Sequence, residues 1–336
     1  MKKKMFLLFV LLLSLTVLLT ACGGSGTKPA DDNKAPAKTT SSKGGKRLIM
    51  GSGPIGGAFY PIAGGIAALI NENVPGVSVS VQVTGGGIEN ARLVGIGEID
   101  FGMSAADQAY HAYNKSGMFA KENLSLKTLG TLHASLQQII VLKKSGIREF
   151  EDLKGKKVAI GEPGGGSEVA FKQVLKALNW QESDVKMIFL PYDQAMDQLA
   201  DGLIDAACVY SGMPASTVTA LATQQDVLMV NHSDELFEKL AKITPLYQSE
   251  VVKAGGYKGM DKDIKTPVQR IMFTCSDKID PELAYQITKA VYGNLDKLAK
   301  YHAAAATITL ESAPKTSAPL NDGAKKYYVE MGVLKP

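Results

Sequence analysis

Two glycine-rich segments are the parts of this chain whose residue types could bind a ligand directly. They are Gly51–Ala58 and Gly161–Ser167. Each follows a β-rich run and opens into an apolar helix-like pattern, so each would present the unpaired backbone N–H groups of a helix N-terminus. Such groups bind anions without a charged side chain. The pattern predicts recognition of a small anion by backbone groups.

The two segments belong to a longer unit that occurs twice. Gly-x-Ile-Asp follows each of them and enters another apolar strand, at Gly97–Asp100 and at Gly202–Asp205. A duplicated strand–loop–helix unit indicates two similar lobes, each with a loop that faces a shared cleft. Two lobes that close on a small anion are typical of a receptor rather than of an enzyme.

The chain as a whole alternates strand-like and helix-like segments, which is typical of α/β folds. We expect a two-lobed α/β fold, each lobe a mixed sheet flanked by helices, with the ligand in the cleft between them. A turn at 143–146 and a glycine- and lysine-rich stretch near 250–268 are the candidate crossovers. We therefore assign residues 46–143 plus 266–336 to lobe 1 and residues 144–265 to lobe 2.

The first 45 residues predict export and membrane attachment. Three lysines precede an apolar run from Met5 to Leu19, and Thr20-Ala21-Cys22 follows, so residues 1–21 read as a signal peptide. The run is shorter than the about 20 apolar residues of a membrane span. The boundary resembles a bacterial lipobox, in which Cys22 carries a lipid; the alternative is an ordinary signal peptide with an incidental cysteine. Residues 22–45 are small and polar, as in a flexible tether.

Charge and cysteine content narrow the possibilities further. The formal net charge of +4 falls to +1 without the three lysines of the signal peptide, and no basic stripe predicts nucleic-acid binding. Only four arginines, Arg47, Arg92, Arg148 and Arg270, could clamp a carboxylate. Cys208 and Cys275 lie in apolar runs in different lobes. We expect two buried free thiols, although a disulfide between them would pin the lobes together.

Motifs of enzymes are incomplete here. Gly51-x-Gly53-x-x-Gly56 matches the dinucleotide fingerprint, but residues 74–88 hold no acidic residue for the ribose. Glu168 stands where a phosphate-binding loop needs lysine. The four histidines are isolated, with no serine-hydrolase pairing and no metal-ligand spacing. We expect no enzymatic activity, no cofactor and no metal site.

Six motifs in a fixed order resemble those of one known family. They are Gly-Gly-Ala-Phe-Tyr-Pro at 56–61, Thr-Gly-Gly-Gly-Ile-Glu-Asn at 84–90, Asp-Leu-Lys-Gly-Lys-Lys-Val at 152–158, Gly-Glu-Pro-Gly-Gly-Gly-Ser at 161–167, Gly-Met-Pro at 212–214 and Pro-Leu-Asn-Asp-Gly-Ala-Lys-Lys-Tyr-Tyr at 319–328. The chain resembles the TAXI-type solute-binding proteins of TRAP transporters over essentially all of 46–336. It departs from their pattern at Phe59, where tyrosine is usual, and at Asn321-Asp322, which replaces His-Pro.

The resemblance implies a periplasmic-binding-protein fold of type II and a small carboxylate ligand, such as glutamate, a 2-oxo acid or a dicarboxylic acid. It also implies delivery to the membrane subunits of a TRAP permease, by a monomer outside the cytoplasm that is anchored through Cys22. A sensory protein that presents its closed form to a membrane histidine kinase would have the same mature sequence features. The departure at Phe59 removes one hydroxyl and leaves the ligand open.

The candidate ligand-binding residues come from both repeats and from the strand ends near them. They are Ser52, Gly57, Ala58, Tyr60, Thr84, Gly86, Asn90, Ser104, Ala105, Gly165, Ser167 and Ser211. Ser167 could also be a plain helix N-cap, and Tyr60 could be a core residue. Arg92 is a reserve candidate for a second carboxylate, with an exposed helix face as the alternative.

Overall fold

The computed structural model describes residues 45–336, so the predicted signal peptide, Cys22 and all of the predicted tether except residue 45 lie outside the described residues. The strands are β1 (Lys46–Gly51), β2 (Val77–Gln82), β3 (Phe101–Ala105), β4 (Leu126–Leu142), β5 (Lys157–Ala159), β6 (Lys186–Ile188), β7 (Ala206–Ser211), β8 (Val227–Met229), β9 (Gln248–Val252) and β10 (Ile264–Ser276). The helices are α2 (Phe59–Asn73), α3 (Gly87–Ile96), α4 (Ala106–Asn114), α5 (Gly166–Ala177), α6 (Tyr192–Ala200), α7 (Ser216–Gln224), α8 (Asp234–Ile243), α9 (Pro281–Tyr292), α10 (Leu295–Leu298) and α11 (Asp322–Glu330). Within 45–336, no helix has the length and apolar character needed to cross a bilayer.

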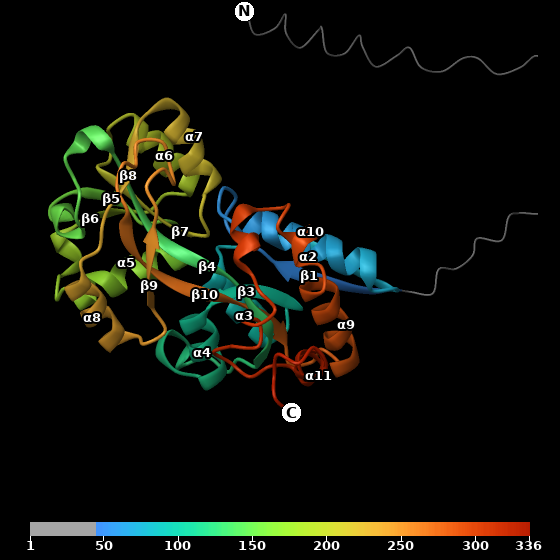
Figure 1. Ribbon diagram of the computed structural model, residues 1–336. Helices are drawn as coiled ribbons and strands as arrows, with labels where there is room; N and C mark the ends of the chain where they lie inside the picture. Colours follow the sequence, from blue (N-terminus) through green and yellow to red (C-terminus); the bar gives the residue numbers. More distant parts are fainter. Residues whose placement is uncertain (1–44) are drawn as a thin grey trace, which may run out of the picture. The chain divides into compact units, whose positions relative to one another are not determined.

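The sheet order shows the duplication directly (Figure 1). The main path is β2-β1-β3-β10-β4-β7-β5-β6, with β8 beside β4 and β9 beside β10. From one edge, the parallel strands β2, β1 and β3 are followed by the long antiparallel strand β10. From the other edge, the parallel strands β6, β5 and β7 are followed by the long antiparallel strand β4. In each half, the strand that comes first in the sequence lies between the second and the third. The predicted mixed α/β architecture with two similar halves is therefore confirmed.

The repeated Gly-x-Ile-Asp motif has the same structural role in both halves. The Asp100 carboxylate accepts a hydrogen bond of 2.8 Å from the backbone N–H of Ile49 in β1. The Asp205 carboxylate accepts one of 2.8 Å from the N–H of Lys157 in β5. Each aspartate thus ties the beginning of the third strand of its half to the first strand.

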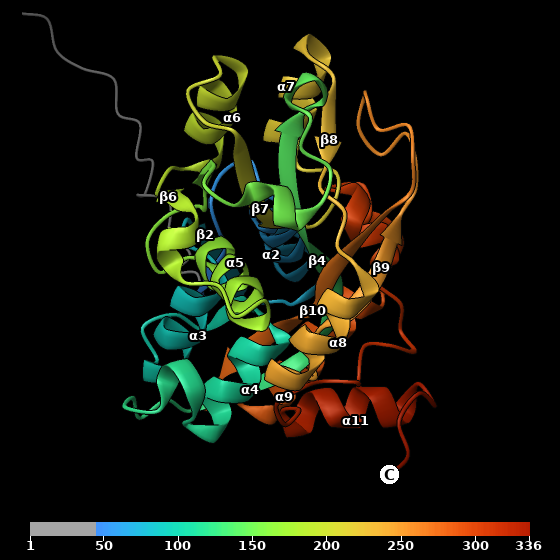
Figure 2. The same cartoon turned by 90° about the vertical axis from the view of Figure 1, so that its left-hand side faces the viewer.

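Two large apolar cores lie on either side of the middle of the sheet. One contains residues of β1, β3, α2 and α9, and the other residues of β5, β7, α5 and α6. The long strands β4 and β10 contribute to both, and the core changes near His133 in β4 and between Val268 and Ile271 in β10. Figure 2 shows these strands running together through the centre. We refer to the half with β1 as lobe 1 and to the half with β5 as lobe 2.

The expectation of two buried free thiols is confirmed, because Cys208 and Cys275 are both buried and form no disulfide. Burial raises the pKa of each thiol to about 12. Both therefore stay protonated and serve as small core side chains.

Candidate functional site

The ends of the parallel strands in both lobes converge on one small cavity. Five helices begin at its wall: α2, α3 and α4 from lobe 1, and α5 and α6 from lobe 2. Its volume is about 30 Å³. The lining residues are Pro54, Gly57, Ala58, Phe59, Gly85, Gly86, Gly87, Ala105, Gln108, Gly166, Tyr192, Tyr210 and Ser211. Because the first N–H groups of a helix lack partners within it, this wall is suited to an anion.

Hydrogen bonds between the lobes close this cavity. The backbone N–H of Ala58, in lobe 1, donates to Ser211 Oγ of lobe 2 over 2.8 Å. Ser216 Oγ of lobe 2 donates to the Gly56 carbonyl over 3.1 Å. Ligand pockets usually have about 300–1,000 Å³, whereas about 10–15 Å³ suffices for one water. An amino acid would therefore enter only when the lobes separate.

Five predicted residues line this cavity together: Gly57, Ala58, Gly86, Ala105 and Ser211. The N–H of Ala105 is taken by Gln108 Oε1 at 2.9 Å, and that of Ala58 by Ser211. Two of the donors predicted for an anion are thus satisfied by side chains of the protein. A ligand carboxylate would have to displace these acceptors.

Four other predicted residues form a buried network behind the cavity wall. Asn90 Nδ2 donates to the carbonyls of Ser52 (2.7 Å) and Met103 (2.9 Å), and its Oδ1 accepts from Thr84 Oγ1 at 2.8 Å. Ser52 Oγ donates to the Gln82 carbonyl, and Ser104 Oγ donates to the Gly87 carbonyl at 2.8 Å. These side chains join the first glycine loop to the loop before α3. Their hydrogen bonds are made within lobe 1, and of the four only Thr84 also lines the mouth of the cleft described below, so the direct ligand contact predicted for them stays a prediction.

Gly165 and Ser167 lie beside the cavity, in lobe 2. Both line a second small space of about 10 Å³, together with Pro54 and Gly85 of lobe 1. Ser167 Oγ lies 2.7 Å from Tyr192 Oη and accepts the N–H of Tyr210 at 3.0 Å. A Cβ at residue 165 would stand 2.9 Å from the Glu162 carbonyl oxygen. Close backbone approach, rather than a left-handed φ, therefore requires glycine there.

The structure separates Tyr60 and Arg92 from the cavity. Tyr60 is 43% exposed at the beginning of α2, and its neighbour Phe59 lines the cavity instead. In this closed form Tyr60 therefore lies outside the cavity lining, and its contact with a ligand stays a prediction. Arg92 lies on the outer face of α3 and forms a two-pronged ion pair with Glu122, with distances of 2.7 and 2.9 Å. The alternative of an exposed helix face is confirmed for Arg92.

The sequence interpretation missed Tyr192, Tyr210 and Gln108. Burial raises the pKa of Tyr192 to about 12 and that of Tyr210 well above its usual range, so both hydroxyls stay neutral. The duplication could have pointed to Tyr192. It begins α6, which has the same place in lobe 2 as α3 has in lobe 1, and the loop before α3 supplied the predicted residues Thr84 and Gly86. Gln108 is simply one polar residue in the first turn of α4, with no distinguishing pattern.

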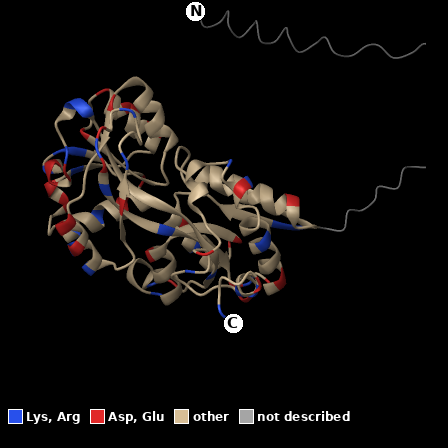
Figure 3. Ribbon diagram, viewed as in Figure 1, with Lys and Arg blue, Asp and Glu red and all other residues tan. Residues whose placement is uncertain are grey.

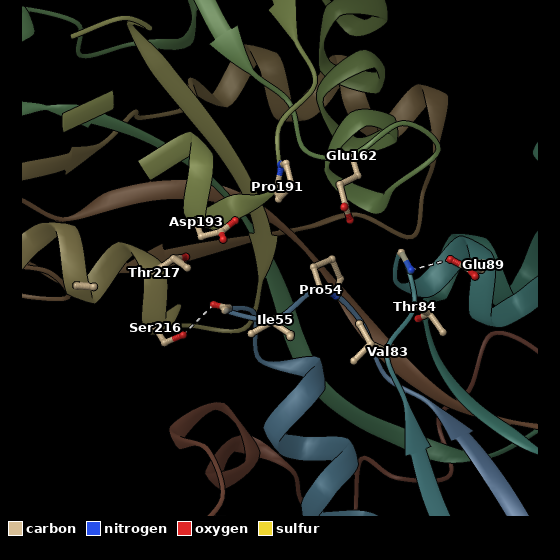
Figure 4. Close-up of a pocket in the computed structure, with 13 residues that line it drawn as sticks. Pro54, Ile55, Val83, Thr84, Glu89, Glu162, Pro191, Asp193, Ser216 and Thr217 are labelled. Carbon is tan, nitrogen blue, oxygen red and sulfur yellow. Dashed lines mark hydrogen bonds between the residues drawn. The ribbon is translucent and has the colours of Figure 1, made fainter. Parts of the chain in front are cut away.

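A larger pocket of about 730 Å³ forms the mouth of the cleft (Figure 4). Both lobes line it, and three of the lining residues are acidic: Glu89, Glu162 and Asp193. No lysine or arginine belongs to this lining. Glu89 Oε2 accepts the N–H of Gly85 at 2.6 Å, while Glu162 and Asp193 extend from lobe 2 (Figure 4). The mouth is therefore negatively charged.

Charge elsewhere in the described residues lies mostly on outer helices and loops, and the central strands carry few charged side chains (Figure 3). Between residues 45 and 336, no three His, Cys, Asp or Glu side chains are grouped so that they could hold a metal ion.

The described residues thus form two α/β lobes joined by shared strands, with helix N-termini around an interlobe cavity. The chain belongs to the NMT1-like family, which it matches over residues 50–332.

Solved structures with a similar fold include binding proteins of ABC importers. One is the alkanesulfonate-binding protein SsuA from Xanthomonas axonopodis pv. citri bound to MOPS, with 17% identity, 86% of this chain and 92% of that chain covered, and a TM-score of 0.48. Another is a structure reported for glutathione import via GshT and the cystine ABC importer TcyBC of Streptococcus mutans, with 12% identity, coverage of 83% and 99%, and a TM-score of 0.49. At such identities and scores, these similarities say nothing about the ligand.

Proposed function

We propose that this protein is an extracytoplasmic solute-binding lipoprotein that captures a small carboxylate and delivers it to a TRAP-type membrane permease. One observation carries the proposal: helix N-termini from both halves of a duplicated fold enclose a single cavity. Membership of the NMT1-like family supports solute binding. The resemblance of the six motifs to TAXI-type proteins supports the TRAP permease as the partner.

Binding follows from the hydrogen bonds that close the cavity. When the lobes separate, Ser211 withdraws from the N–H of Ala58. A carboxylate oxygen can accept that N–H and the neighbouring free N–H groups at the beginning of α3. Charge-assisted hydrogen bonds contribute about 1.5–3 kcal/mol each. Three or four of them would support the about −8 kcal/mol of micromolar binding.

The acidic groups favour an amino acid over a 2-oxo acid or a plain dicarboxylic acid. Glu89, Glu162 and Asp193 would repel a dianion at the mouth and attract an ammonium group. Outside the lining of the cavity and its mouth, Asp107 of α4 is only 2% exposed, and its Oδ2 accepts a hydrogen bond of 3.1 Å from Gln173 Nε2 of lobe 2. Among the described residues its Oδ1 has no partner. A buried carboxylate with an unpaired oxygen is stabilised by a cation.

Native mass spectrometry of the purified protein, followed by calorimetry, tests the ligand class. We expect L-glutamate to bind at least about tenfold more tightly than 2-oxoglutarate, which lacks the ammonium group. Tighter binding of 2-oxoglutarate would refute the amino-acid assignment while leaving solute binding intact. Failure of both acids, with a different molecule in the mass spectrum, would refute the carboxylate class.

Uptake of the bound solute tests the partner. Proteoliposomes that contain the TRAP permease should accumulate the ligand only when this protein is added and an ion gradient is imposed. Accumulation that is independent of the protein would reject the delivery role.

A further inference from the structure

Arg270 occupies an unusual position for an arginine. Arg92 pairs with Glu122, and Arg148 donates to the carbonyls of Ile147 and Lys143. Arg270 is half-buried in β10, and its side chain is absent from the side-chain hydrogen bonds and ion pairs within 45–336. The guanidinium nitrogens are not among the buried polar atoms that lack a partner, so solvent reaches them, and the five N–H donors are free to bind an anion from outside the chain.

The side chain of Arg270 lines a cavity of about 590 Å³ between the lobes. Arg270 pairs with Ala134 of β4, and the register of the two strands shifts between Arg270 and Met272. Such a bulge re-aims side chains and increases the local twist. It lies where β10 passes from one core to the other, so the cavity is at the hinge.

Apolar groups from both lobes form the cavity wall. Ala134, Leu136, Met213, Val252, Ala304 and Thr307 are among the lining residues. The segment 211–214 separates this cavity from the cleft, since Ser211 lines the cleft cavity while Met213 and Pro214 line this one. The hinge cavity is thus a space distinct from the proposed solute site.

The charges around the hinge cavity favour an anion with one charged end. Lys253 also lines it but pairs with Asp263 at 2.8 Å. Glu250 is the acidic residue of the lining, and it is exposed. His133 is buried nearby, and its pKa is lowered to about 3 by burial and then by the charges of His302 and Arg270. Neither Glu250 nor any other described acidic side chain forms an ion pair with Arg270, so its guanidinium is available to an anion.

We propose that Arg270 and the apolar wall around it form a second binding site, at the hinge, for a small monocarboxylate with an apolar chain. The carboxylate accepts two hydrogen bonds from the guanidinium, as arginine and carboxylate geometries allow. The chain of the ligand covers the apolar wall. Because both lobes contribute to that wall, occupation of the hinge site alters the equilibrium between open and closed lobes and thereby the affinity of the cleft.

Calorimetry of the full chain with hexanoate tests the site. Arg270→Gln should weaken hexanoate binding about tenfold or more, because it removes a charge-assisted hydrogen-bond pair. Arg47→Gln is the matched control. Arg47 is exposed on β1 and lies outside the cavity lining, so this substitution removes the same charge without changing the site. Thr307→Trp should block binding by filling the cavity from an exposed position, even if Arg270→Gln proves unstable. Glu250→Gln should strengthen binding.

The outcomes separate this site from the cleft. Loss of hexanoate binding in Arg270→Gln and Thr307→Trp, but not in Arg47→Gln, supports the hinge site. Equal affinity of Arg270→Gln and the unmodified protein overturns it. Loss of binding in Gly57→Val, with Arg270→Gln unaffected, places hexanoate in the cleft and also overturns the hinge site.

Discussion

Gly57→Val tests whether the lobes close at the small cavity. Gly57 does not adopt a left-handed φ, so backbone strain is not the reason for glycine here. A Cβ at this residue would lie 3.3 Å from Ser211 Oγ and 3.5 Å from Tyr192 Cε2, both of lobe 2. The γ carbons of valine extend about 1.5 Å further. The lobes could then no longer approach to their present distance.

The cost follows from the contacts that closure would lose. In the proposed ligand-bound form the carboxylate has displaced Ser211 from the Ala58 N–H, so what valine would prevent is the closing of lobe 2 onto the ligand, and each charge-assisted hydrogen bond lost in this way is worth about 1.5–3 kcal/mol. Loss of one such bond disfavours the ligand-bound closed form by about 1.5–3 kcal/mol. If the ligand binds only with closure, its affinity should fall about tenfold to 150-fold.

Calorimetry with L-glutamate measures this loss, and small-angle scattering reports closure through the radius of gyration. Gly64→Val is the matched control, because no atom lies within 4 Å of a Cβ at residue 64 in the following helix. Unchanged affinity in Gly57→Val, with both variants folded by circular dichroism, would show that the ligand does not bind between these loops.

Four further changes have defined outcomes. Tyr60→Phe should leave calorimetric affinity within about twofold, since the side chain is 43% exposed and outside the cavity lining; a loss of about tenfold would restore the predicted contact. Arg92→Ala should also leave affinity unchanged because Glu122 already holds the guanidinium, and lost binding would indicate an arginine clamp. Cys22→Ala should move the protein from membrane to soluble fractions with unchanged affinity, and continued membrane attachment would rule out the lipid anchor. Burial lowers the pKa of His133 from 6.5 to about 3 and that of His232 from 6.5 to about 4. Between pH 6.5 and these values only the unfolded chain takes up the protons, so urea denaturation should give about 1.4 kcal/mol less stability per histidine at pH 5.5 than at pH 7.5. Equal stability at the two pH values would contradict this.

The duplicated architecture could be predicted because its signals are local. Glycine loops, helix beginnings and the two Gly-x-Ile-Asp motifs each depend on a few adjacent residues. The two aspartates each accept a backbone N–H of the first strand in their half. The buried thiols followed from apolar surroundings in the same way.

The division of roles at the site could not be predicted, because it depends on contacts between distant segments. Asn90 and Ser211 are both small polar residues near strand or helix ends. One is satisfied wholly within lobe 1, and the other reaches across the cleft to Ala58. Likewise, β4 is one continuous strand of 17 residues, and nothing in its sequence marks the change of core near His133. Only the packing of both lobes determines it.

The engagement of the Ala58 N–H by Ser211 has a consequence for selectivity. A ligand oxygen must replace the Ser211 hydroxyl as the acceptor of the Ala58 N–H. The net gain in binding free energy is therefore the difference between a hydrogen bond to a charged acceptor and one to a neutral acceptor. A neutral solute would gain almost nothing by that exchange, whereas a carboxylate gains the charge-assisted increment. The acidic mouth then disfavours anions that lack a compensating cation. If the proposed function holds, the two conditions together would select a molecule that carries both charges, without any arginine in the lining of either the cavity or its mouth.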